Sequence, residues 1–241
     1  MAYTHYIFFA ANPRSGDQKA AEFLNKSRNV QCKFEEYGKN AYGHIFNVLE
    51  PEDSSRSYKM IQKTVESFAE RATVVVALMG GDGGIMRLIQ VLEPLIDIGK
   101  VKFVALPFGS GNDMAQTLKW GATTSMKYLR DIRTIIKEIV LNTKDAKVNI
   151  WETILTFRKK GDCLMIGSDQ REKSVFGKKE KDRIKKGHYV HTMFMVNYFS
   201  MGECAKIGFE FEMNRTRSRL GNLVMYGRSG LKRLCCACCW S

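Results

Sequence analysis

The stretch TVVVALMGGDGGIMRL, residues 73–88, decides the fold, because an apolar run passes through a glycine-rich loop into a second apolar run. Val74 to Met79 is uninterrupted, rich in valine and too short for a helix, which is typical of a strand buried on both faces. From Ile85 to Leu92 the apolar residues return at helical spacing. We therefore expect a strand, a loop and the N-terminus of a helix.

The loop between these elements suits a phosphate group. Its glycines are Gly80, Gly81, Gly83 and Gly84. They allow a tight turn, close approach of a ligand and consecutive N–H donors, and a helix N-terminus adds a favourable dipole. Asp82 lies inside this loop, where its carboxylate would repel phosphate unless a cation separates them, so its position predicts Mg²⁺. The simpler alternative is a turn that only requires glycine.

Two more loops follow apolar runs that read as strands. The first run is Tyr3 to Ala11 and the second is Val101 to Leu106. Successive strand, loop and helix units predict a parallel α/β sheet, whose ligands bind at the carboxyl ends of the strands. We expect all three loops to face one crevice, although a surface turn and helix caps are the alternatives for these two. Their residues are Asn12, Pro13, Arg14, Ser15 and Gly16, and Gly109, Ser110, Gly111, Asn112 and Asp113.

The remaining periodicity predicts two domains. Residues 1–147 form the α/β domain, and residues 148–241 form an incomplete β-rich domain that begins with an alternating strand around Trp151. Within the first domain the patterns favour a strand at 46–49 and helices at 19–27, 55–71, 85–99 and 125–139. In the second domain, residues 189–211 read as aromatic, strand-like sequence with one turn.

Composition describes a basic protein of 241 residues with a hydrophobic content of 44% and a net charge of +13. This charge favours an anionic partner, such as a nucleotide, a nucleic acid or an acidic membrane surface. The seven cysteines do not form a disulfide framework, and neither a signal peptide nor a spanning segment is evident. We expect a cytoplasmic protein with peripheral membrane association. No nucleic-acid motif accompanies the charge, so no nucleic acid is expected.

Much of the excess charge lies in one polar segment. Residues 158–188 carry 11 Lys and Arg against five acids and few apolar residues. This composition predicts a solvated, disordered insertion within a hairpin, with a membrane-surface or nucleic-acid patch as the alternative.

Three segments closely resemble the catalytic region of eukaryotic diacylglycerol kinases. They are MGGDGG at 79–84, PFGSGNDMA at 107–115, and NYFSMGECAKIGFEFEMNRTRSRLGNLVMYG at 197–227. The GGDG motif alone also resembles NAD kinases, phosphofructokinases and sphingosine kinases, but the third segment favours the diacylglycerol branch. The resemblance covers almost the whole chain outside the basic insertion and the last few residues.

The resemblance implies transfer of the γ-phosphoryl group of ATP to 1,2-diacylglycerol, which gives phosphatidic acid in lipid signalling. It implies nucleotide binding by residues 12–16, 80–84 and 109–112, and it implies that Asp82 holds Mg²⁺ or activates the acceptor. No histidine lies in these motifs, so a carboxylate is the expected base.

Two departures from the family pattern define the alternatives. Gly84 stands where the family usually has threonine, and the chain ends at Ser241, inside the family's second domain. A C-terminally truncated, catalytically incomplete fragment that binds nucleotide or anionic membrane is therefore one alternative, and a sphingosine or ceramide kinase is another. The cysteines from Cys235 to Cys239 are too crowded for one tetrahedral zinc site, which leaves a truncated or misassembled end, or S-acylation, as explanations.

Overall fold

The computed structural model describes residues 3–158, 164–166, 172–174, 188–196, 200–214, 216 and 218–237. The chain divides into two compact units. The first is Met1–Lys147 with Arg217–Leu220, and the second is Val148–Thr216 with Gly221–Ser241.

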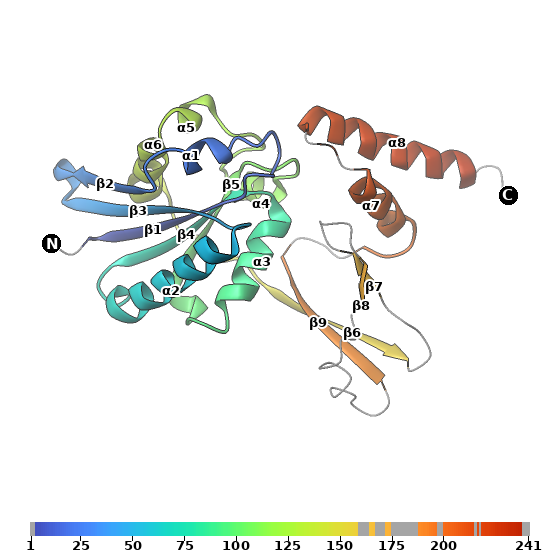
Figure 1. Ribbon diagram of the computed structural model, residues 1–241, viewed down its shortest axis with the longest axis horizontal. Coiled ribbons are helices and arrows are strands. Elements are labelled where there is room, and N and C mark those ends of the chain that lie inside the picture. The colour runs from blue at the N-terminus through green and yellow to red at the C-terminus, as the bar shows by residue number, and fades with distance from the viewer. Residues whose placement is uncertain are drawn as a thin grey trace. The chain divides into compact units, whose positions relative to one another are not determined.

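The first unit is built on a five-stranded, mostly parallel sheet with the order β2-β3-β1-β4-β5 (Figure 1). The strands are β1 (His5–Ala11), β2 (Asn29–Phe34), β3 (Lys39–Asn47), β4 (Thr73–Gly80) and β5 (Val101–Pro107). Only β2 runs antiparallel to its neighbour, β3, to which a short turn (η1, Glu35–Tyr37) connects it. The parallel α/β fold expected from the sequence is confirmed.

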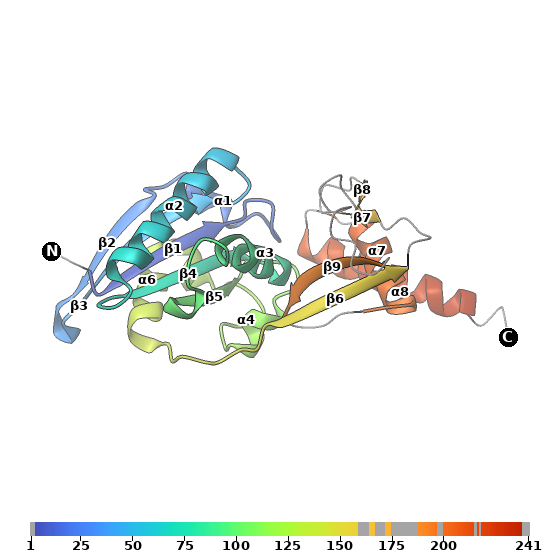
Figure 2. The ribbon, with the colours of Figure 1, turned by 90° about the horizontal axis from the view of Figure 1, so that it is seen from below.

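Helices cover both faces of this sheet, as Figures 1 and 2 show. The helices of this unit are α1 (Ala21–Leu24), α2 (Pro51–Phe68), α3 (Asp82–Leu92), α4 (Asp113–Thr117), α5 (Met126–Arg130) and α6 (Ile132–Lys137), with a short 3-10 helix, η2 (Ile98–Lys100), and a short π-helix, η3 (Glu138–Asn142).

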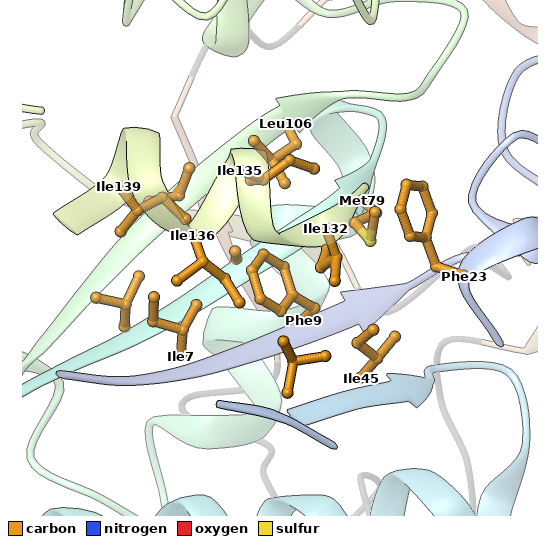
Figure 3. Packing of buried hydrophobic residues seen from close by; sticks show 14 of the residues in the cluster. Ile7, Phe9, Phe23, Ile45, Met79, Leu106, Ile132, Ile135, Ile136 and Ile139 are labelled. Atoms are coloured by element: carbon orange, nitrogen blue, oxygen red, sulfur yellow. The ribbon is translucent and has the colours of Figure 1, made fainter. Parts of the chain in front are cut away.

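Side chains alternate across β1, so each face of the strand packs against a different helix. Ile7 and Phe9 belong to a core cluster that includes Ile132, Ile135 and Ile136 of α6 (Figure 3). On the opposite face, the ring of Tyr6 stacks on Phe68 of α2 with centroids 4.9 Å apart. Burial on both faces explains why the central strands read as continuous apolar runs.

Several boundaries in the first unit differ from those expected. The helix predicted at 19–27 is only the four residues of α1, and the strand predicted at 46–49 is the end of the longer β3. The helix predicted to run to residue 99 ends at Leu92. The helix predicted at 125–139 is interrupted at Asp131, whose extended backbone and side-chain bond to Arg133 N (2.9 Å) start α6 as a separate helix.

The second unit contains two small antiparallel pairs, β6 (Trp151–Arg158) with β9 (His188–Met195) and β7 (Leu164–Ile166) with β8 (Glu172–Ser174). The β6 and β9 pair forms the two-stranded ribbon visible in Figure 2. Because Arg158 pairs with His188, the basic segment is an insertion in a hairpin, as expected. Most of that segment, and with it the prediction of disorder, lies outside the described residues.

The prediction of strand up to residue 211 is wrong after the turn. The second unit also holds α7 (Glu203–Met213) and, from Gly221 onward, α8 (Arg219–Ala237), neither of which we predicted. Gly202 precedes α7 with a φ of +67°, a conformation that favours glycine, and Glu203 then pairs with Lys206 one turn later at 2.6 Å. The alternation of Ile207, Phe209 and Phe211 imitates a strand although these residues are helical.

Candidate active site

The three predicted loops meet at one edge of the sheet. In the parallel register Ala11 is level with Met79, and Gly80 is level with Pro107, so the loops after β1, β4 and β5 begin side by side. Asn12 N also donates to Met79 O at 3.1 Å, which joins the first two loops. The gathering of the loops that we expected from the sequence is confirmed.

Glycine is required where these loops touch through their backbones. Gly16 has a φ of +53°, and a Cβ there would lie 2.5 Å from Phe108 O in the third loop. A Cβ on Gly109 would overlap Gly81 Cα and lie 2.8 Å from Gly81 N. By contrast, Gly83 and Gly111 have open space beside them, which leaves room for a ligand. Packing therefore explains some of these glycines but not all of them.

Asp82 joins the second loop to the third. Its Oδ2 accepts a hydrogen bond from Asp113 N at 2.8 Å, and its Oδ1 accepts one from Met114 N at 3.0 Å. These N–H groups belong to the start of α4, so Asp82 caps this helix from another loop. The alternative that Asn112 or Asp113 caps the helix is wrong, because neither side chain makes a capping hydrogen bond at the start of α4. The residue that we expected to hold metal therefore uses both carboxylate oxygens in hydrogen bonds to the start of α4.

The buried side chain of Asn112 holds the third loop together through hydrogen bonds. Its Oδ1 accepts from Gly109 N at 2.9 Å, and its Nδ2 donates to Gly109 O and Ala122 O at 2.9 and 2.8 Å. The side chain is buried and both amide hydrogens are used. Any contribution of Asn112 to ligand binding is therefore through the shape of the loop.

Three groups at these loops remain available to a ligand. Arg14 is exposed, and its guanidinium has no ion-pair partner within the described residues. Gly83 is exposed in the first turn of α3, where N–H groups lack α-helical acceptors, although the next one, Gly84 N, donates to Gly81 O at 3.0 Å. The exposed carboxylate of Asp113 accepts no hydrogen bond and forms no ion pair within that same set of residues, and it borders a shallow hollow with Gln116, Thr117 and Lys119.

Asp113 is the residue that sequence reasoning missed. We treated it as a helix cap because it follows Asn112 at the start of a helix. The available signal was the presence of two carboxylates in neighbouring loops, since one of them can cap α4 while the other stays free. The carboxylate of Asp113 is exposed, whereas both carboxylate oxygens of Asp82 accept backbone N–H groups.

These residues could hold a magnesium ion only if substrate phosphates and water supplied the other ligands. No group of three or more His, Cys, Asp or Glu residues that could hold a metal occurs within the described residues. Mg²⁺ is commonly held by one or two carboxylates together with substrate phosphates and water. The exposed carboxylate of Asp113 can supply one such ligand, so the loops can accept the metal as part of a nucleotide complex.

Comparison with known proteins identifies the family. The diacylglycerol kinase catalytic domain matches residues 6–144, which is more than half of the chain and includes all three loops. The chain belongs to this kinase family. The family match therefore falls on the α/β unit and on the loops at the carboxyl edge of its sheet.

Relatives across plants and animals carry the same family name. "Diacylglycerol kinase 1" of Oryza sativa subsp. japonica is 23% identical over 92% of this chain and 46% of its own length. "Probable diacylglycerol kinase 3" of Caenorhabditis elegans is 21% identical over 97% of this chain and 25% of its own. The "Eye-specific diacylglycerol kinase" of Drosophila melanogaster is 26% identical over 92% and 13%. The chain thus spans less than half of each relative, and no solved structure matches it significantly.

Proposed function

We propose that the chain binds ATP with Mg²⁺ and transfers the γ-phosphoryl group to the free hydroxyl of 1,2-diacylglycerol, which yields phosphatidic acid. The observation that carries this proposal is the kinase family match over the residues that build all three loops. The geometry supports it, because the loops combine open glycines, a helix N-terminus, a cation and a free carboxylate at one sheet edge.

In this mechanism, different residues bind the phosphates, position α4 and accept the hydroxyl proton. Amide groups near Gly83 and the guanidinium of Arg14 bind phosphate oxygens, and bound Mg²⁺ supplies further neutralisation of their charge. Asp82 positions α4 through its two backbone hydrogen bonds, and α4 carries Asp113. The acceptor oxygen forms a bond to the γ-phosphorus while the bond to the β,γ-bridging oxygen breaks. The hydroxyl proton passes to a carboxylate, for which Asp113 is our candidate.

The decisive experiment is a kinase assay with the purified chain, diacylglycerol in mixed micelles and γ-labelled ATP. We expect labelled phosphatidic acid, and little label on sphingosine or ceramide offered in its place. Label on those acceptors instead would assign the chain to another lipid kinase class. ATP binding without any product would support the alternative of a fragment that only binds nucleotide.

Replacing each aspartate by the uncharged asparagine then distinguishes the roles of the two carboxylates. Asp113→Asn should lower the rate by about a hundredfold or more with the fold intact, as loss of a general base does. Asp82→Asn should lower the rate and also destabilise α4, since an amide oxygen accepts the backbone N–H groups less well.

The matched control is Asp97→Asn. Asp97 also accepts a backbone N–H, from Gly99 at 2.9 Å, but it lies in the turn before β5, at the opposite end of that strand from the loops. Near-normal turnover by Asp113→Asn, or a loss equal to that of Asp97→Asn, would remove Asp113 from the mechanism.

A further inference from the structure

Helix α8 is amphipathic in an unusual orientation, because its apolar residues face outward. Leu220, Leu223, Val224 and Leu231 occupy one stripe at helical spacing, and their exposed fractions are 71%, 70%, 62% and 63%. On the opposite side of the helix Asn222 and Ser229 are buried. We call the four apolar residues the α8 stripe.

The polar side of α8 is held within the protein by specific contacts. Asn222 Oδ1 accepts from Thr216 N at 2.7 Å and from Thr216 Oγ1 at 3.0 Å. The ring of Tyr226 meets Phe211 of α7 edge to face, with centroids 5.4 Å apart. These contacts fix the rotation of α8 about its axis, so the outward direction of the α8 stripe is part of the folded structure.

Charge indicates what covers the α8 stripe. The sequence of α8 contains four Lys or Arg residues and no Asp or Glu. Arg228 and Lys232 are exposed one turn apart, and neither has an ion-pair partner within the described residues. Apolar residues flanked by uncompensated cations match an anionic lipid surface, in which the apolar groups enter the acyl boundary and the cations contact headgroups.

Other occupants fit this helix less well. Two α8 helices packed through the α8 stripe would bring together two segments that each carry the exposed cations Arg228 and Lys232 and no acidic residue to compensate them, which opposes self-association. Within the described residues, no helix is both long enough and apolar enough to cross a bilayer, and α8 with its four cations illustrates why. A helix of this kind is suited to lie in the membrane interface.

We propose that α8 is a membrane-docking helix that binds anionic bilayers through the α8 stripe together with Arg228 and Lys232. Docking by these residues differs from the assignment of membrane contact to the basic segment 158–188. It would bring a lipid kinase to the surface where its acceptor resides, but it does not depend on that activity. It can therefore be measured without ATP or diacylglycerol.

The test is co-sedimentation of the full chain with vesicles of phosphatidylcholine, with or without about one third phosphatidylserine, at about 0.1 M salt. We expect binding to the anionic vesicles only. Leu223→Gln/Leu231→Gln should weaken this binding by roughly tenfold or more, because it removes apolar area from the stripe. Arg228→Gln/Lys232→Gln should weaken it by about fivefold for each charge that reaches the surface.

Matched variants come from the first unit. Lys59→Gln/Lys63→Gln removes two exposed cations at the same spacing of four residues, from α2, and Leu49→Gln/Leu95→Gln removes two exposed leucines. Both control variants should bind anionic vesicles as the parent chain does. Equal losses in the controls would show that net charge or general hydrophobicity drives binding, and would overturn the proposal.

A second measurement guards against misfolded variants. Hydrogen exchange in residues 220–232 of the parent chain should slow when phosphatidylserine vesicles are added, while exchange in α2 should not change. Unchanged exchange in α8 on bound vesicles would refute docking by this helix. Loss of a dimer in the leucine variant, with vesicle binding retained, would instead identify a second copy of the chain as the occupant.

Discussion

The two units of this chain contrast in how they bury apolar residues. Every buried hydrophobic residue that the structure describes lies between residues 6 and 140, on or around the five-stranded sheet. Beyond residue 147, the described buried residues are the polar Asn222 and Ser229, while Trp151, Ile154 and Phe209 are exposed. The first unit therefore has its own hydrophobic core, whereas the described residues of the second leave large apolar side chains exposed.

The largest expected change in stability comes from creating a cavity in the hydrophobic core of the first unit. Phe9→Ala should lower the free energy of unfolding of the first unit by about 4 kcal/mol, since Phe9 is fully buried between β1 and α6. Leu223→Ala on α8 should change it by less than about 0.5 kcal/mol. Urea unfolding followed through Trp120, in a background where Trp151 and Trp240 are replaced by Phe, would measure both.

Trp120 is the suitable probe because it packs against the first core. If Leu223→Ala shifted its transition as much as Phe9→Ala does, the two units would unfold together and the contrast between them would be invalid.

Two glycine substitutions with a smaller effect on stability distinguish glycines that are needed for packing from glycines that leave room for a ligand. Gly109→Ala should destabilise the first unit by about 2 kcal/mol, because its Cβ would collide with the Gly81 backbone. Gly111→Ala meets no atom closer than Asp82 Oδ2 at 4.0 Å, so stability should stay within about 0.5 kcal/mol of the parent. If ligand approaches Gly111 closely, the same variant should nevertheless weaken ATP binding.

Thermal unfolding and titration calorimetry with ATP would measure the two variants. Equal ATP affinity of the parent and Gly111→Ala would show the third loop to be a plain turn, and an unchanged melting temperature for Gly109→Ala would contradict the backbone contact.

The smallest expected effect is on acid stability. Burial alone would raise the pKa of Asp53, but the N–H of Asn47 and the cations of Arg56 and Arg28 hold the pKa below its ordinary value. A carboxyl with a lowered pKa stabilises the fold above the unfolded pKa of about 3.9, and this contribution disappears as the pH falls through the folded pKa. Unfolding free energy in the first unit should therefore fall below about pH 4.

Asp53→Asn should remove this acid dependence at a cost on the order of 1 kcal/mol at neutral pH. Buried carboxylates are absent from the described residues of the second unit, so α8 variants should keep the parent's acid profile. Urea titrations at pH 7 and pH 3.5 would compare them, and an identical pH dependence for Asp53→Asn would show that other groups dominate.

The local sequence pattern predicted the central strands of the first unit well, because each is an apolar run followed by a loop rich in glycine or proline. β4 and β5 are apolar runs ended by glycine and proline, and parallel strands of this kind place their loops together. The hairpin of β2 and β3 escaped notice because β2 is an edge strand with exposed Gln31 and Lys33, so its sequence looks polar.

Local pattern failed where long-range contacts decide the structure. The bonds from Asp82 to the start of α4 cross 31 and 32 residues, and no spacing in the sequence specifies them. The helices α7 and α8 were missed for a related reason, because their apolar residues are largely exposed and thus do not mark a core-facing stripe.

The backbone contact between Gly81 and Gly109, with Gly16 against Phe108, has a consequence for protein engineering. The loops fit one another as a set, since each occupies volume that a side chain on another would need. A chimera that takes only one loop from a relative would introduce a mismatch at a contact with no spare space. Transplanting all three loops together is the route by which a new specificity can be introduced into this scaffold.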